Sequence, residues 1–127
     1  MRRVAANKVY FSPTIAYLRH IVEIFGKTVV NHYELADELE LTEWLGGIII
    51  IADENSITQF VDDIHQATFT PTHIDEVVNY IYNTVRPAIT SEKSSSRKTA
   101  LHLSGVDIST GKILDKIHIT HINEPII

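Results

Sequence analysis

The stretch "LGGIIIIADENSITQFVDDIHQAT" (residues 45–68) joins two elements with different hydrophobic patterns. Four consecutive isoleucines after a pair of glycines are typical of a strand that is buried on both faces. Beyond them, four apolar side chains recur with the spacing of one helix face: Ile57, Phe60, Val61 and Ile64. This spacing predicts an amphipathic helix, and Ser56 with Gln59 three residues later fits a capping box at its start. The stretch therefore predicts a buried strand followed directly by a helix.

A second helix is predicted a few residues downstream. Apolar residues from Ile74 to Val85 keep helical spacing. Thr70 is the predicted cap, Pro71 occupies the first helical position, where a missing N–H costs nothing, and Pro87 ends the helix.

Strands are predicted on both sides of this helical pair. Residues 1–11 form a first strand, and residues 18–25 and 28–35 form a hairpin around Gly26 and Lys27. A second hairpin joins residues 100–108 to 112–122. The segregated order predicts an α+β fold, in which a mostly antiparallel sheet from N- and C-terminal hairpins has two helices inserted between its strands.

The two turns also predict which residues face each other. A two-residue turn at Gly26 and Lys27 pairs Ile24 with Val29 and His20 with Tyr33. A three-residue loop at 109–111 places His102 opposite His118. On the other face of this second hairpin, Leu101, Leu103, Ile117 and Ile119 form the predicted core side.

Length and composition limit the class of protein. The 127 residues predict a single domain spanning 1–127, and the absence of cysteine excludes disulfides and thiolate metal sites. A formal net charge of −5 disfavours a nucleic-acid partner. No apolar run reaches the length of a membrane span, and no apolar stretch follows the N-terminal arginines, so we expect a cytoplasmic protein without a membrane partner. The serine-rich segment at about 90–98 is the predicted mobile loop.

The run "VEIFGKTVVNHYELADELELTEWLGGIIII" (22–51) resembles the N-terminal strands of amidohydrolase-superfamily enzymes. In that family, such strands form a small β-sandwich beside a catalytic barrel. The Pro-Gly-Phe and His-x-His motifs that should follow are replaced here by "ADENSITQF", and an eight-stranded barrel needs about 200 residues or more. The resemblance therefore implies an accessory layer without the enzyme, and it carries no metal or catalytic residue over to this chain.

Candidate catalytic chemistry is limited to one carboxylate–histidine pair. Asp62 and His65 are three residues apart and share a face of the first predicted helix, and a carboxylate that orients a histidine is a common acid–base arrangement. That face lies opposite the apolar stripe, however. We therefore interpret the pair as part of a solvated helix surface.

Candidate metal ligands come from two places in the sequence. His102 and His118, paired across the second hairpin, are close enough to share Zn²⁺ or Ni²⁺, although a structural zinc site normally has four ligands. Glu38, Glu40 and Glu43 offer carboxylates for a divalent ion, but they lack the closely alternating spacing of calcium loops. We favour a protein without cofactor or bound metal.

Several large apolar and aromatic residues are candidates for an interface instead: Trp44, Tyr80, Tyr82, Ile126 and Ile127. Unpaired hairpin edges would also favour association. The sequence thus predicts a small soluble non-enzymatic interaction or scaffold module, which self-associates as a homo-oligomer or binds another protein. The alternative is a small enzyme or metal-binding protein that uses histidine and carboxylate side chains.

Overall fold

The computed structural model describes residues 1–35, 42–66, 69–84 and 97–123. The predicted mobile loop at 90–98 lies outside these residues except for its last two, and Lys98 is the first residue of a strand. Ile126 and Ile127 also lie outside them, as do Glu38 and Glu40.

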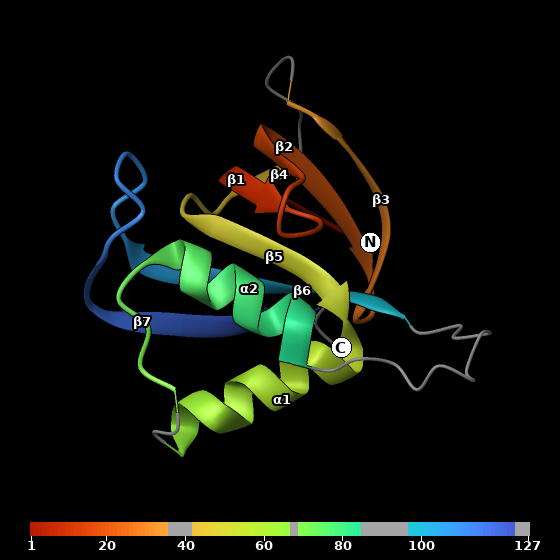
Figure 1. The fold of residues 1–127 in the computed structure, drawn as a ribbon. Coiled ribbons are helices and arrows are strands. Elements are labelled where there is room, and N and C mark those ends of the chain that lie inside the picture. Colours follow the sequence, from red (N-terminus) through yellow and green to blue (C-terminus); the bar gives the residue numbers. More distant parts are fainter. Residues whose placement is uncertain (36–41, 67–68, 85–96, 124–127) are drawn as a thin grey trace.

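Seven strands form one mixed, mostly antiparallel sheet, with two helices between its N- and C-terminal strands (Figure 1). The elements are β1 (Arg2–Tyr10), β2 (Ala16–Phe25), β3 (Thr28–Glu34), β4 (Thr42–Trp44), β5 (Ile48–Asp53), α1 (Glu54–His65), α2 (Ile74–Thr84), β6 (Lys98–Val106) and β7 (Ile113–Ile122). The strand order is β3-β2-β1-β5-β6-β7, and the short β4 also pairs with β1. The predicted α+β fold, with its two hairpins and two inserted helices, is confirmed.

Two strand pairs are parallel, which the sequence did not indicate. β4 and β5 both run parallel to β1, first along Arg3–Ala5 and then along Lys8–Tyr10. The two glycines between them, Gly46 and Gly47, have φ angles of 70° and 61°, a backbone conformation that residues other than glycine adopt only with strain. β1 and β5 together therefore join the N-terminal hairpin to the C-terminal hairpin.

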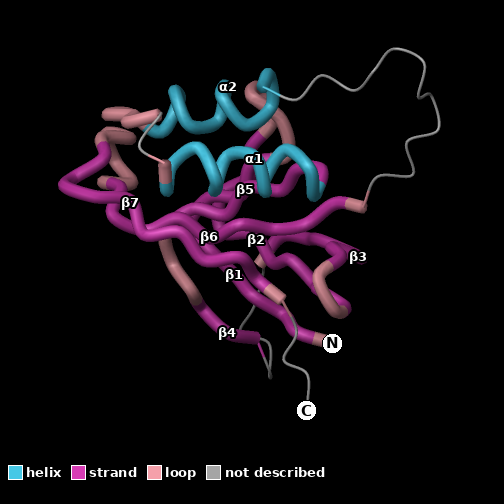
Figure 2. The backbone as a smooth tube through the Cα atoms, turned by 90° about the horizontal axis from the view of Figure 1, so that it is seen from below, coloured by secondary structure: helices cyan, strands magenta, loops and turns pink. Residues whose placement is uncertain are grey.

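The core has two parts, one on each face of the sheet. Figure 2 shows both helices on the same side of β5, β6 and β7. Beneath them lies a cluster that includes Ile50, Phe60, Ile81 and Leu103, all fully buried. A second cluster lies on the other face of the sheet, with contributions from Val4, Val22, Ile49, Ala100 and Ile122. Neither helix of the described chain is long and apolar enough to cross a membrane.

The helix boundaries differ from those predicted. α1 begins at Glu54 with Asp53 as its N-cap, so Ser56 lies inside the first turn and is buried, and the predicted capping box is wrong. Its apolar stripe is confirmed, because Ile57 and Phe60 are fully buried and Val61 and Ile64 pack against the same cluster.

α2 begins at Ile74, later than the predicted start at Pro71. The carboxylate of Glu76 accepts hydrogen bonds from the backbone N–H groups of Thr72 and His73. A carboxylate in the first turn satisfies N–H groups that have no partner within the helix, so this residue fixes the start of α2 in place of Thr70.

The first hairpin keeps the predicted turn but not the predicted pairing beyond it. Ile24 faces Val29 as expected. A bulge between Glu23 and Ile24 then shifts the register, so that His20 faces Glu34 instead of Tyr33. A one-residue shift moves every later side chain of a strand to the other face, and here it turns Asn31 away from the buried face and His32 toward it.

The second hairpin is also shifted, here by two residues. An irregularity between Ser104 and Val106 includes Gly105, whose φ is 88°. Ser104 therefore faces His118, and His102 faces Thr120. The predicted pairing of His102 with His118 is wrong. A shift of two residues leaves the faces unchanged, so the predicted core side is confirmed: Leu101 and Leu103 are fully buried, and Ile117 and Ile119 pack against the helix-covered cluster.

Candidate functional site

Four rings from three segments meet where β2 and β3 run side by side. Phe11 follows β1, Tyr17 and His20 belong to β2, and His32 belongs to β3. The ring centroids of Tyr17 and His20 are 4.7 Å apart and stacked, and those of Phe11 and His32 are 4.3 Å apart. We call these residues the aromatic–histidine cluster.

Two backbone irregularities assemble this cluster. Tyr17 and His20 are three residues apart, and in a regular strand they would point to opposite faces. Between them, Arg19 has a φ of 49°, a sharp departure from strand geometry that lets both rings lie on one face. The bulge between Glu23 and Ile24 then turns His32 to the same face, diagonally across from His20. Neither irregularity has a glycine that would mark it in the sequence.

The two imidazoles are joined by a hydrogen bond, with His20 Nε2 and His32 Nδ1 2.9 Å apart. His20 is only 6% exposed, and burial lowers its pKa, with a further decrease from His32 and an opposing effect from Glu34. A neutral His20 has one N–H group. When this group is on Nε2 it donates to His32 Nδ1, which leaves the proton of a neutral His32 on Nε2.

The other ring nitrogen of His20, Nδ1, is a buried polar atom without a hydrogen-bond partner among the described residues. With Nε2 as the donor, the unpartnered atom is an acceptor lone pair rather than an N–H group. Orphaned buried acceptors are found more often than orphaned buried donors. This arrangement therefore favours Nε2 protonation for both rings.

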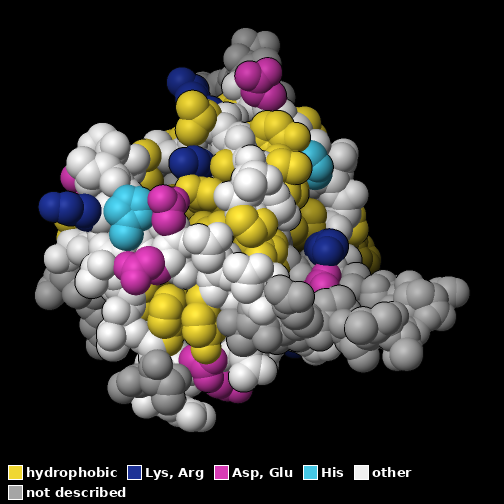
Figure 3. Space-filling view, viewed as in Figure 1, with side chains coloured by type: hydrophobic (Ala, Val, Ile, Leu, Met, Phe, Trp, Pro, Cys, Tyr) yellow, Lys and Arg dark blue, Asp and Glu magenta, His cyan; other side chains and the backbone are white. Residues whose placement is uncertain are grey.

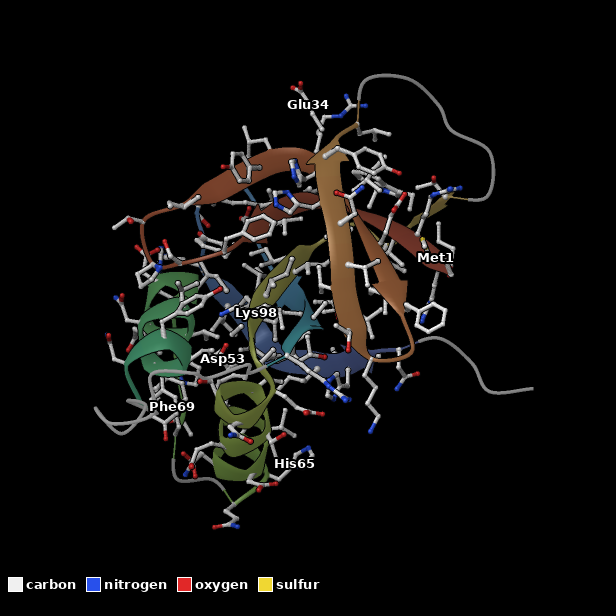
Figure 4. The ribbon with its side chains drawn as sticks, turned by 90° about the vertical axis from the view of Figure 1, so that its right-hand side faces the viewer. Met1, Glu34, Asp53, His65, Phe69 and Lys98 are labelled. Atoms are coloured by element: carbon white, nitrogen blue, oxygen red, sulfur yellow. The ribbon has the colours of Figure 1, made fainter. Side chains whose placement is uncertain are left out.

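A cavity of about 310 Å³ lies beside the cluster, between β3 and the paired strands β5 and β6. It is lined by Phe11, Val29, Val30, Asn31, His32, Ile51 and Lys98. Lys98 Nζ lies 2.7 Å from Asp53 Oδ1, and Figure 4 shows these two residues side by side at the end of β5. The cavity thus has an apolar interior with an imidazole and an ammonium group among its lining groups.

A second hollow, of about 220 Å³, lies beside the start of α2 and the β6–β7 loop. His73 lines it and has both ring nitrogens occupied: Nε2 lies 3.0 Å from the Thr110 carbonyl oxygen, and Nδ1 accepts from the Asp75 N–H at 3.0 Å. The approach of Gly111 is so close that an added Cβ would lie 2.7 Å from the imidazole. His73 therefore fastens the helix start to the loop, and we interpret it as structural.

The predicted carboxylate–histidine pair is not assembled as a site. Asp62 and His65 are both exposed on α1, and Figure 4 shows His65 at the end of that helix. No hydrogen bond or ion pair joins them among the described residues. Their neighbour Asp63 does have a partner, because its carboxylate accepts a hydrogen bond from the Tyr80 hydroxyl.

The predicted metal ligands are also kept apart. His102 is half-buried, and its Nε2 bonds to the Gly46 carbonyl oxygen at 3.0 Å, whereas His118 is exposed opposite Ser104. Glu43 pairs with Arg2 at 2.7 Å. Within the described ranges, no three histidine or carboxylate side chains are grouped so that they could hold a metal ion.

The predicted interface residues that can be located have different environments. Trp44 is half-exposed on β4. Tyr82 is turned toward the sheet, where its hydroxyl donates a hydrogen bond to the Ile51 carbonyl oxygen. Tyr80 stacks on Phe69, with centroids 4.1 Å apart, so its ring is already covered on one side.

The aromatic–histidine cluster itself was missed by sequence reasoning. The predicted pairing of His20 with Tyr33 puts His20 and His32 on opposite faces of the hairpin, because it does not include the bulge. The number of aromatic and histidine residues near the first turn was the only signal available.

No protein-family model, curated protein or solved structure matches this chain. The resemblance of residues 22–51 to the N-terminal strands of amidohydrolases therefore stays a prediction.

Proposed function

We propose that this chain is a small non-enzymatic module that self-associates through the surface around the aromatic–histidine cluster. The observation that carries the proposal is the exposure of apolar side chains there: Tyr17 is 44% exposed, Ile15 48% and Val30 50%. Tyr17 contacts Phe11, and Phe11 lines the same cavity as Val30. Contiguous apolar surface of this kind is common at sites of protein–protein contact.

The same region is visible as a group of hydrophobic side chains on one face of the molecule. Figure 3 shows these side chains over the N-terminal strands, with a histidine at their margin. β3 pairs only with β2 among the described strands, so backbone groups along its outer edge are not used by a further strand. An edge strand beside an apolar surface is a favourable place for a second chain to add.

A second copy of this chain fits the surface better than a strongly charged partner. A two-fold contact requires a surface that is complementary to itself, and rings and aliphatic groups meet this condition. The charged residues at its margin include one of each sign, because Arg19 and Glu34 are both exposed at the same end of the β2–β3 pair. A stable homodimer buries about 800 Å² per partner, so the contact must extend along β2 and β3 beyond the rings.

The test is sedimentation equilibrium of the full chain over a concentration series, on wild type and on Tyr17→Ser. We expect a dimer or larger species for the wild type. The dissociation constant of the Tyr17→Ser oligomer should be at least about tenfold higher than that of the wild type, as for the loss of an aromatic interface residue. The matched control is Leu114→Ser, because Leu114 is 67% exposed on β7, which lies at the opposite end of the strand order from β3. A wild-type monomer at high micromolar concentration, or equal effects of the two substitutions, would contradict the proposal.

The expected cytoplasmic location stays a prediction. It has no bearing on the surface itself, and fractionation of cells that express the full-length protein would test it.

A further inference from the structure

The cavity beside the aromatic–histidine cluster has features that an interface alone does not require. Its base is apolar, because Ile51 belongs to the second core cluster and is almost fully buried, and Val29 packs against that cluster. Phe11 closes another side. Its volume of about 310 Å³ is at the small end of the range for ligand pockets, which is about 300–1,000 Å³. It has the size for one ring or a short branched chain.

The charged and histidine groups of this cavity favour an anion. Lys98 supplies an ammonium group, and His32 supplies the imidazole nitrogen that does not face His20. His32 Nε2 has no hydrogen-bond partner among the residues described. No aspartate or glutamate is among the described residues that line the cavity. A negatively charged group could therefore enter without meeting a carboxylate on the wall.

Asp53 modifies this preference from outside the cavity. It lies 2.7 Å from Lys98 Nζ and occupies one of the three donors of the ammonium group. Two donors remain, and the contact with Asp53 restrains a long side chain that is otherwise 59% exposed. The carboxylate also offsets part of the positive charge. Removing its charge should therefore strengthen the binding of an anion, whereas removing the charge of Lys98 should weaken it.

From these observations we infer that the cavity binds a small amphipathic carboxylate, with its apolar body against Phe11, Val29 and Ile51 and its carboxylate between Lys98 and His32. This inference goes beyond the proposed self-association and does not depend on it. The ligand class follows from the combination of an apolar interior with two cationic or hydrogen-donating groups on its walls, His32 on β3 and Lys98 on β6.

The test uses 3-phenylpropionate as the probe, titrated into the ¹⁵N-labelled full chain at low ionic strength. We expect saturable chemical-shift changes at Val29, His32 and Ile51. The neutral amide of the same acid should bind about two- to fivefold more weakly, the usual effect of losing one partly exposed charge contact. Acetate, which has the charge without the body, should give no saturable change in this range of concentration.

Three substitutions test the assignment of the charged groups. Lys98→Met should weaken the probe about fivefold, and Asp53→Asn should tighten it by about threefold, because the competing carboxylate charge is lost. Lys112→Met is the matched control, since Lys112 is an exposed lysine on the β6–β7 loop, and it should change the affinity by less than about twofold.

Three results would overturn the inference: equal binding of acid and amide, equal effects at Lys98 and Lys112, or shift changes confined to another part of the molecule. The two proposals can fail separately. A wild type that is monomeric but binds the acid contradicts only the proposed self-association, and Tyr17→Ser should still bind the acid even where it no longer self-associates. An oligomer that gives no saturable shifts up to about 10 mM probe contradicts only the ligand site.

Discussion

Replacement of Gly47 by alanine should destabilise the protein far more than the same replacement at Gly26. Both glycines have positive φ angles, 61° and 66°, so an alanine pays a similar conformational cost of about 1–2 kcal/mol at either position. Their surroundings differ. A Cβ on Gly26 would have no atom within 4 Å, whereas one on Gly47 would lie 2.7 Å from the Leu103 carbonyl oxygen and 3.2 Å from His102 Nε2.

The magnitude at Gly47 follows from what must move. The Leu103 carbonyl belongs to the backbone of β6, next to β5, and cannot rotate away as a side chain can. Crowding of this kind costs about 1–3 kcal/mol. Displacement of His102 also removes its bond to the Gly46 carbonyl oxygen, a loss of about 1 kcal/mol. We expect Gly47→Ala to lower the free energy of unfolding by about 3–6 kcal/mol, against about 1–2 kcal/mol for Gly26→Ala.

Urea unfolding followed by far-ultraviolet circular dichroism measures both variants, with the slope checked to be unchanged. If Gly47→Ala does not fold, Gly46→Ala supplies a second comparison, because its Cβ would make only ordinary contacts at 3.6 Å. Equal losses at Gly47 and Gly26 would show that the close approach of the β4–β5 connection to β6 is incorrect.

Two further predictions concern titrating groups. Burial lowers the pKa of His20 and of His121 below that of a free histidine, so the unfolded chain binds protons more readily, and the free energy of unfolding should decrease as the pH falls below about 6.5. His20→Gln should make this decrease smaller in urea titrations between pH 7 and 5, and an unchanged pH dependence would contradict the burial of that imidazole. Burial also raises the pKa of the Tyr82 hydroxyl, which donates to the carbonyl oxygens of Ile51 and Tyr10. In a spectrophotometric alkaline titration of the folded protein, Tyr82→Phe should therefore remove one tyrosine that resists ionisation. The substitution should also lower the free energy of unfolding by about 1 kcal/mol. Loss of a normally ionising tyrosine instead would be inconsistent with this contact.

Those parts of the fold that depend on burial were predictable from the sequence. The isoleucines of β5 lie in the centre of the sheet, and the spacing of Ile57 and Phe60 reflects the face of α1 that packs on it. Such patterns survive because each apolar side chain needs a buried position whatever its detailed neighbours are. The order of strands and helices along the chain then gave the α+β class.

Register could not be predicted in the same way. Each hairpin departs from its simplest pairing at an irregularity, one between Glu23 and Ile24 and one that includes Gly105. A bulge is decided by which side chains the two faces of the sheet can accept, and this depends on strands far away in the sequence. The isolated Gly105 was a signal of strand irregularity, whereas nothing marked the bulge at Glu23.

The candidate site could not be predicted from the sequence, because the strand register decides which histidines lie together. A regular hairpin with a three-residue loop would place His102 opposite His118, but the shift in the second hairpin separates them. His20 and His32 became a pair only through the shift in the first. A difference of one or two residues in pairing therefore decided which histidines meet.

The central claim is that the chain contacts a second copy of itself through the aromatic–histidine surface. It is tested most directly by ¹⁵N–¹H spectra of the wild type recorded over a concentration series, because exchange between monomer and dimer shifts the signals at the contact. We predict concentration-dependent shifts at Ile15, Tyr17 and Val30 and constant signals at Leu114. Spectra that do not change with concentration, or shifts that centre on Leu114 and the edge of β7, would contradict it.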